Sequence, residues 1–163
     1  MSGAPPPVSI AELDARLQIA TAMDSYAIGL DGRDLDRFLD AWHEDAVWDV
    51  DHPPARCAGH AEIAEYARES WTGFRVVNHI TTNHIVEFEN GDVEGGEQAS
   101  GVGHAAAILV SADGLYITAA AIFHDRYQRR AGRWRISYRK VALNHWTEHP
   151  QANVRVHVGD VTG

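Results

Sequence analysis

The N-terminal part of the chain carries apolar residues at helical spacing. Ser9 is followed three residues later by Glu12, and Val8 and Leu13 flank the pair, a pattern typical of a helix N-cap with a hydrophobic staple. Apolar residues then recur every three or four positions in a stripe made of Ile10, Leu13, Leu17, Ala20, Met23, Ala27 and Leu30. The spacing predicts a first helix that ends near Asp31, where an Asp-Gly pair favours a turn.

Shorter elements follow this helix. Asp34 is a suitable N-cap for a second, short helix. The inward positions of that helix are Leu35, Phe38, Leu39 and Trp42. We then expect a short strand over 46–50, a proline-containing loop over 52–58, and a third helix over 59–71 with Ile63, Tyr66 and Ala67 inside.

The remainder of the chain is patterned as β-structure. Four strands are predicted at about 75–89, 93–111, 115–129 and 133–146, separated by short turn sequences that favour antiparallel pairing. Helices first and a long meander afterwards predict an α+β fold with the helices on one face of a curved antiparallel sheet. We expect a disordered segment over 1–8, one domain over 9–149, and an extended C-terminal arm over 150–163.

Composition narrows the classes of partner. The 163 residues contain 14 Lys and Arg against 23 Asp and Glu, a net charge of −9 that disfavours nucleic acid and anionic membranes. Cys57 is the single cysteine, so an internal disulfide is impossible and a reducing cytoplasm is expected. The chain begins with MSGAPPPVS and has no long apolar run, which argues against a signal peptide or a membrane span.

The stretch NHITTNHIVEF carries two histidines inside a predicted strand. Side chains alternate between the two faces of a strand, so His79 and His84 are expected on opposite faces. Asp31 is unusual because it lies at the negative end of a helix dipole. It either bonds nearby backbone N–H groups in its turn or accepts a hydrogen bond from a histidine. Spacing leaves the partner open among His79, His84, His104, His124 and His145.

Four segments together resemble a known family. They are YAIGLDGRDLDRFLDAWHEDAVW, GHAEI, NHITTNHIVEF and DRYQRRAGRWRISYRKV, and they resemble the SnoaL-like branch of the nuclear transport factor 2-like superfamily over roughly residues 9–147. Within that branch the chain looks most like the relatives of scytalone dehydratase, bile acid 7α-dehydratase and hexachlorocyclohexane dehydrochlorinase. The resemblance implies a cone-shaped α+β barrel around one deep pocket.

The resemblance also implies roles for particular residues. Asp31 and His79 fall on the family's Asp-His dyad, and His104 falls on a second catalytic histidine of scytalone dehydratase. Tyr26 matches a functional Tyr or Lys position, and Arg139 matches an arginine that acts on the leaving group in the dehydrochlorinase. Arg139 differs in strand parity from Trp134 and Ile136, so it reaches the pocket only if a bulge intervenes. The expected apolar pocket walls are Val47, Trp48, Tyr66, Phe74, Ile108, Tyr116 and Phe123.

These roles imply a lyase that needs no metal or organic cofactor. His79 removes a proton from carbon while Tyr26 and His104 donate hydrogen bonds to the carbonyl group or protonate the departing oxygen, and a small hydrophobic hydroxylated carbonyl compound loses its β-substituent. An isomerase or polyketide-type cyclase would use the same base, and the fold also serves non-catalytic ligand-binding or assembly proteins. By analogy with the family we expect a homodimer or homotrimer formed through the outer sheet face.

A metal centre is the weaker alternative. His43, Glu44, Asp45, Asp49, Asp51 and His52 form an acidic cluster with imidazoles. No helical HxxxH spacing places two of these ligands on one face, so the pattern does not predict a metal site.

Overall fold

The computed structural model describes residues 8–89 and 97–149, so the N-terminal residues 1–7, the segment 90–96 and the predicted C-terminal arm lie outside the described residues. The helices are α1 (Ile10–Asp31), α2 (Leu35–Asp40) and α3 (Gly59–Gly73). The strands are β1 (Trp42–Val50), β2 (Ala55–Ala58), β3 (Phe74–Phe88), β4 (Gln98–Ser111), β5 (Tyr116–Arg130) and β6 (Arg133–His149). The predicted order of elements is confirmed, with one strand, β2, in the segment that was expected to be a loop.

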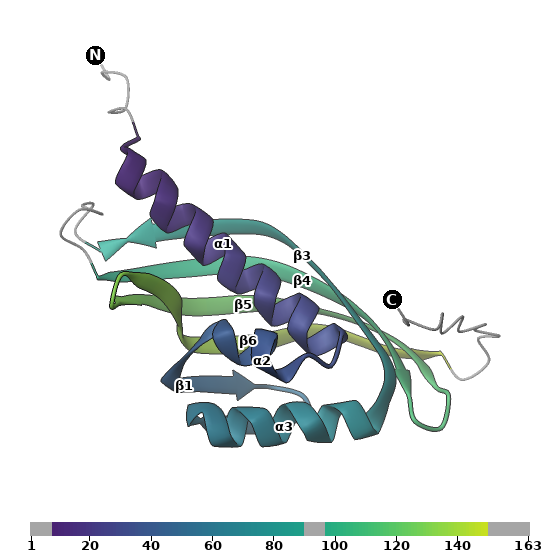
Figure 1. Ribbon diagram of the computed structural model, residues 1–163. Coiled ribbons are helices and arrows are strands. Elements are labelled where there is room, and N and C mark those ends of the chain that lie inside the picture. The colour runs from purple at the N-terminus through teal and green to yellow at the C-terminus, as the bar shows by residue number, and fades with distance from the viewer. Residues whose placement is uncertain (1–7, 90–96, 150–163) are drawn as a thin grey trace, which may run out of the picture.

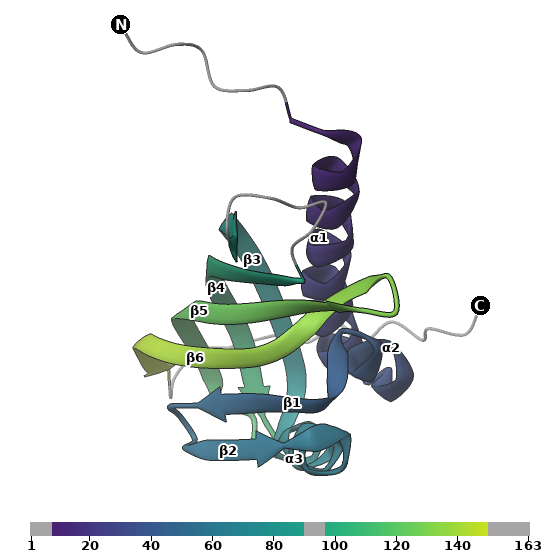
Figure 2. The same ribbon diagram turned by 90° about the vertical axis from the view of Figure 1, so that its left-hand side faces the viewer.

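The six strands form one curved sheet in the order β2-β1-β6-β5-β4-β3. Strands β3 to β6 pair antiparallel in sequence, as their short turns predict, whereas β1 lies parallel to β6. The helices lie on one side of this sheet, with α1 crossing it and α3 running beside β1 and β2 (Figures 1 and 2). The α+β cone with an unclosed sheet confirms the predicted fold class.

Helix α1 begins as predicted but turns a different face inward. The Ser9 hydroxyl accepts a hydrogen bond from the Glu12 backbone N–H at 3.1 Å, which caps the helix. The first half of the predicted stripe is wrong, because Ile10, Leu13 and Leu17 are exposed. The buried face instead comprises Ala15, Ile19, Ala22, Met23, Tyr26, Ala27, Gly29 and Leu30. None of the described helices is long and apolar enough to cross a membrane.

Close packing holds α1 against α2. A Cβ atom added to Gly29 would lie 2.5 Å from the backbone nitrogen of Phe38, so only glycine permits this approach. Phe38 is fully buried and lies among the rings of Tyr26, Trp42 and Trp48 at centroid separations of 5.5 to 5.9 Å. This aromatic cluster packs the C-terminal half of α1 against α2 and β1.

Several register shifts interrupt the strands, and two of them, one in β3 and one in β6, decide which side chains of the site face the helices. In β3 the register shifts between Thr82 and Ile85, where Asn83 adopts a φ of 54°. On β5, the neighbours Arg126 and Tyr127 pair with Tyr138 and Ile136 of β6. Ser137, which lies between those two partners, is therefore the extra residue of a bulge in β6. An extra residue reverses the alternation of side chains beyond it, so both strands exchange their inner and outer positions along their length.

Candidate active site

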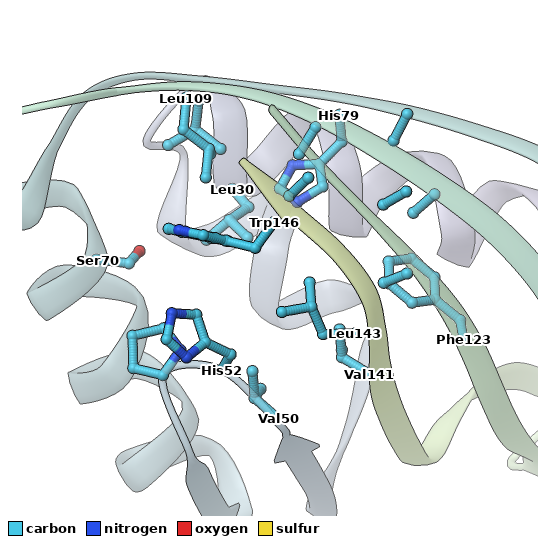
Figure 3. Close-up of a pocket in the computed structure, with 18 of the residues that line it drawn as sticks. Leu30, Val50, His52, Ser70, His79, Leu109, Phe123, Val141, Leu143 and Trp146 are labelled. Carbon is cyan, nitrogen blue, oxygen red and sulfur yellow. The ribbon is translucent and has the colours of Figure 1, made fainter. Parts of the chain in front are cut away.

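A cavity of about 130 Å³ lies between the helices and the concave face of the sheet. That volume is close to the roughly 150 Å³ of an apolar cavity that holds one benzene molecule. Figure 3 shows that the walls come from α1, β1, α3 and the strands of the sheet. Its side chains are mainly apolar, and they include Leu30, Trp48, Val50, Phe74, Val77, Leu109, Phe123, Val141, Leu143 and Trp146.

Small residues on the sheet leave room for this cavity. Ala105 pairs with Ala121 across β4 and β5, and Ala107 pairs with Ala119, so two opposed pairs of methyl groups lie where larger side chains would fill the space. All four residues line the cavity. The cavity is therefore a product of cross-strand register, since the same alanines at other positions would not meet.

Asp31 holds His79 at two points. The Asp31 Oδ1 atom lies 2.6 Å from His79 Nδ1, and Asp31 Oδ2 accepts the His79 backbone N–H at 2.6 Å. The pair is largely enclosed, with 18% and 13% of the Asp31 and His79 side chains exposed. A carboxylate on Nδ1 favours the tautomer with hydrogen on that atom, which leaves Nε2 free to accept a proton. Asp31 thus bonds a histidine across 48 residues of sequence, and it is not a simple turn residue.

Tyr26 lies beside the histidine in the cavity wall. Its ring meets the His79 ring edge-on at a centroid separation of 6.0 Å. Burial raises the pKa of Tyr26 well above its usual range, while the nearby Arg139 opposes part of that effect. The phenol therefore stays protonated at neutral pH and has a proton to donate.

Arg139 faces the concave side of the sheet because the Ser137 bulge intervenes. The guanidinium carbon lies 4.2 Å from the ring centre of Tyr26 and 4.3 Å from that of Phe123, so it is packed between the two rings. Its side chain is fully buried, and it does not line the cavity, whereas both rings do. Burial alone would lower the pKa of Arg139, yet the adjoining Asp125 carboxylate raises it on balance, so the charge is retained.

A chain of polar contacts runs behind the cavity from Arg139. Asp125 accepts from Arg139 Nε at 2.8 Å and from Nη2 at 2.7 Å, and it also accepts the Tyr127 hydroxyl at 2.6 Å. The Tyr127 oxygen lies 3.0 Å from His84 Nε2. His84 therefore faces inward, against the expectation from simple alternation, because the Asn83 bulge precedes it.

The predicted pocket walls divide into two groups. Trp48, Tyr66, Phe74 and Phe123 line the cavity, whereas Val47, Ile108 and Tyr116 do not. Those three lie at positions of β1, β4 and β5 that alternate with buried residues, so they point away from the core.

His104 also lies on the outer face. Its side chain is exposed, and its Nδ1 lies 3.3 Å from the Asn83 amide nitrogen. It alternates along β4 with the buried Gly103 and Ala105, and no bulge lies between them to bring it inward. His104 therefore does not lie in the pocket, where the resemblance placed it, and its side chain does not line the cavity.

Sequence reasoning missed two polar side chains of the cavity. His52 and Ser70 both line it, from the turn after β1 and from the last turns of α3. Ser70 follows Tyr66 and Ala67 at helical spacing, which is the one sequence signal for its inward position. His52 sits in a turn, where no periodicity indicates direction.

The acidic cluster around β1 is occupied by cations of the chain itself. Lys140 Nζ lies 2.9 Å from Asp49 Oδ1 and 2.5 Å from Asp51 Oδ1, and Arg56 also reaches Asp49. Across residues 8–89 and 97–149, no three His, Cys, Asp or Glu side chains come together in a way that suits a metal ion. The metal alternative thus has no geometric support within those ranges.

Comparison with known proteins agrees with this architecture. The model of the SnoaL-like domain matches residues 11–140. The chain belongs to the SnoaL-like domain family. Gamma-hexachlorocyclohexane dehydrochlorinase from Sphingobium indicum is 27% identical over 142 residues, covering 85% of this chain and 88% of that protein.

Solved structures show the same likeness. The crystal structure of LinA superposes with a TM-score of 0.80 at 26% identity, covering 91% of this chain and 97% of that one. A putative scytalone dehydratase from Novosphingobium aromaticivorans gives a TM-score of 0.74 at 18% identity, and the match covers 89% of this chain and 92% of that one. At that lower identity the second match shows a shared fold alone.

Proposed function

We propose that this SnoaL-like protein is a cofactor-independent lyase that removes a carbon-bound proton from a small, hydrophobic, hydroxylated carbonyl compound and expels a β-substituent. The observation that carries the proposal is the two-point hold of Asp31 on His79 at the wall of an apolar cavity. Similarity to dehydrochlorinases, whose name denotes an elimination, supports the same reaction class.

The geometry suits proton abstraction by the imidazole. Asp31 Oδ1 stabilises the imidazolium that forms when His79 Nε2 takes a proton and orients the ring through Nδ1, while Oδ2 fixes the carboxylate on the His79 backbone N–H. A positioned general base of this kind contributes about 10²- to 10⁴-fold in rate. The low exposure of the pair strengthens the electrostatic part of that effect, because few water molecules compete for the charges.

Tyr26 supplies the hydrogen bond that an enolate needs. Its raised pKa keeps the hydroxyl protonated, and its place beside His79 puts the donor near the carbon that loses the proton. Arg139 lies behind Tyr26 and Phe123, so we assign it a positioning role. Its charge over the Tyr26 ring holds that ring in place through a cation–π contact.

The test uses a compact β-hydroxyketone, 3-hydroxycyclohexanone, whose dehydration gives 2-cyclohexenone and is followed by ultraviolet absorbance. We expect turnover by the wild type and a loss of about 10²- to 10⁴-fold in His79→Ala. Asp31→Asn keeps the shape of the pair and should lose a large part of the rate, because the amide cannot stabilise the imidazolium. Circular dichroism checks that both variants fold.

Product mass separates the competing outcomes. Loss of water supports the lyase, whereas an unchanged mass with a moved double bond or a new ring would indicate an isomerase or cyclase that uses the same base. Binding without turnover would indicate a carrier. Full turnover by a folded His79→Ala protein would remove the dyad from the mechanism.

We also propose that a second copy of the chain covers the convex face of the sheet. Four large apolar side chains are exposed there, namely Ile80, Ile85, Val102 and Ile108. Patches of this kind on a sheet face are typical of subunit interfaces. Analytical ultracentrifugation should give a dimer or trimer, and Ile80→Lys should shift it toward monomer, whereas a monomeric wild type would contradict the proposal.

A further inference from the structure

The mouth of the cavity carries a second histidine. His52 follows β1, lines the same cavity as His79, and is itself exposed. Its ring meets the Trp146 ring at a centroid separation of 4.7 Å, and the next residue, Pro53, accepts the Tyr66 hydroxyl at 3.1 Å. Figure 3 shows that His52 and His79 project from different walls of the cavity. Two imidazoles thus bracket the space that a substrate would occupy.

An elimination that expels a hydroxyl group needs an acid as well as a base. Hydroxide is a poor leaving group, so the departing oxygen must receive a proton as the carbon–oxygen bond breaks. A good general acid has a pKa near the working pH. The other hydroxyl groups of the cavity do not meet this requirement. Burial raises the pKa of Tyr26 well above its usual range and that of Tyr66 to about 12.

The remaining polar side chains leave His52 as the candidate. The Ser70 hydroxyl already donates its proton to the Ala67 carbonyl oxygen at 2.7 Å. Histidine is the side chain whose charge changes between about pH 5 and 8, and among the described residues that line the cavity only His52 and His79 are histidines. Exposure at the mouth also gives His52 direct access to bulk water, which replaces its proton after each turnover.

We propose that His52 is the general acid of this site and that the natural leaving group is therefore a hydroxyl group and not a halide. The inference rests on the proposed function. His79 Nε2 takes the proton from the carbon next to the carbonyl group, and the electron pair left behind forms an enolate. The enolate electrons then form the carbon–carbon double bond. The carbon–oxygen bond breaks, His52 gives its proton to the departing oxygen, and water leaves. His79 then loses a proton to solvent and His52 regains one, so the enzyme is restored.

The experiment compares two substrates that yield the same product. Both 3-hydroxycyclohexanone and 3-chlorocyclohexanone eliminate to 2-cyclohexenone, but chloride departs without a proton. We expect His52→Gln to lower kcat/KM for the hydroxy compound by about 10²-fold or more and to change the chloro compound by less than about threefold, after subtraction of the uncatalysed rate. His79→Ala should lower both. The matched control is His124→Gln, because His124 is exposed on β5 and lies outside the cavity.

Deuterium exchange gives a readout that a structural role would not change. In heavy water, His52→Gln should still remove and return the proton next to the carbonyl group, since its base is intact. The recovered 3-hydroxycyclohexanone should therefore carry more deuterium than substrate recovered from the wild type. Equal losses with both substrates, or no loss with either, would overturn the role of His52 alone. Full activity in His79→Ala, or a wild type that eliminates neither compound, would overturn the proposed function as well.

Discussion

The two faces of the sheet carry similar residues that meet different surroundings. On the concave face, His79 bonds Asp31 and His84 contacts Tyr127, both beneath the helices. On the convex face, His104 and His124 are exposed. All four residues are histidines, so residue type does not decide which of them is enclosed and hydrogen-bonded. The face of the sheet decides it. The bulges at Asn83 and Ser137 turn His84 and Arg139 toward the side of the sheet that the helices cover.

The largest expected effect comes from breaking the buried ion pair on the concave face. Arg139→Met leaves the Asp125 carboxylate buried without its cation, and this should lower the free energy of unfolding by about 3–5 kcal/mol. Urea denaturation measures the change. The double variant Asp125→Leu/Arg139→Met should recover much of the loss, because no unpaired charge remains. A single variant within about 1 kcal/mol of the wild type would show that the pair does not act as a unit.

A smaller effect is expected at the bulge that turns His84 inward. Asn83 has a φ of 54°, a conformation that β-branched residues avoid, so Asn83→Val should cost about 1–3 kcal/mol of stability. Asn83→Gly should stay within about 0.5 kcal/mol or stabilise the protein, because glycine adopts this conformation freely. Thermal unfolding compares the two. Thr82→Val is the control on the same strand, and it should resemble the wild type.

The inward position of His84 should also appear in the pH dependence of stability. Burial lowers the pKa of His84, and the nearby Asp125 only partly opposes this. The unfolded chain, with a histidine pKa of about 6.5, then binds more protons than the folded chain, so stability is lost as the pH falls below that value. Between pH 7.5 and 5, His84→Gln should lose less stability than the wild type in urea titrations. If the free energy of unfolding changed with pH equally in the variant and the wild type, His84 would be solvent-exposed and not buried.

The smallest contrast separates two valines of β1. Val50 is buried and lines the cavity, whereas Val47 points outward. Val50→Thr introduces a hydroxyl group into an apolar wall and should cost about 1–3 kcal/mol, while Val47→Thr should stay within about 0.5 kcal/mol. Both replacements keep the side-chain shape. Equal effects in chemical denaturation would mean that the two faces of β1 are equivalent.

Local patterns in the sequence specified most of the architecture. The Ser9 capping box, the Asp34 cap and the short turns between strands depend on neighbouring residues, so they predicted the starts of two helices and the antiparallel meander. The inward face of α1 was predicted incorrectly in its first half. Ile10, Leu13 and Leu17 have helical spacing, but spacing does not say which side of a helix meets the sheet.

The candidate site depended on both the sequence and the tertiary structure. The sequence, through its resemblance to a family, singled out Asp31 and His79. Asp31 ends a helix whose extent local spacing predicted, and His79 lies on β3 ahead of the Asn83 bulge. Only the tertiary structure decided the rest: that two bulges turn His84 and Arg139 inward, that His104 stays outside, and that His52 reaches the cavity from a turn. The physical reason is that one inserted residue or one turn reverses the direction of a side chain. Contacts with residues distant in sequence stabilise such a bulge or turn, so local patterns do not reveal it.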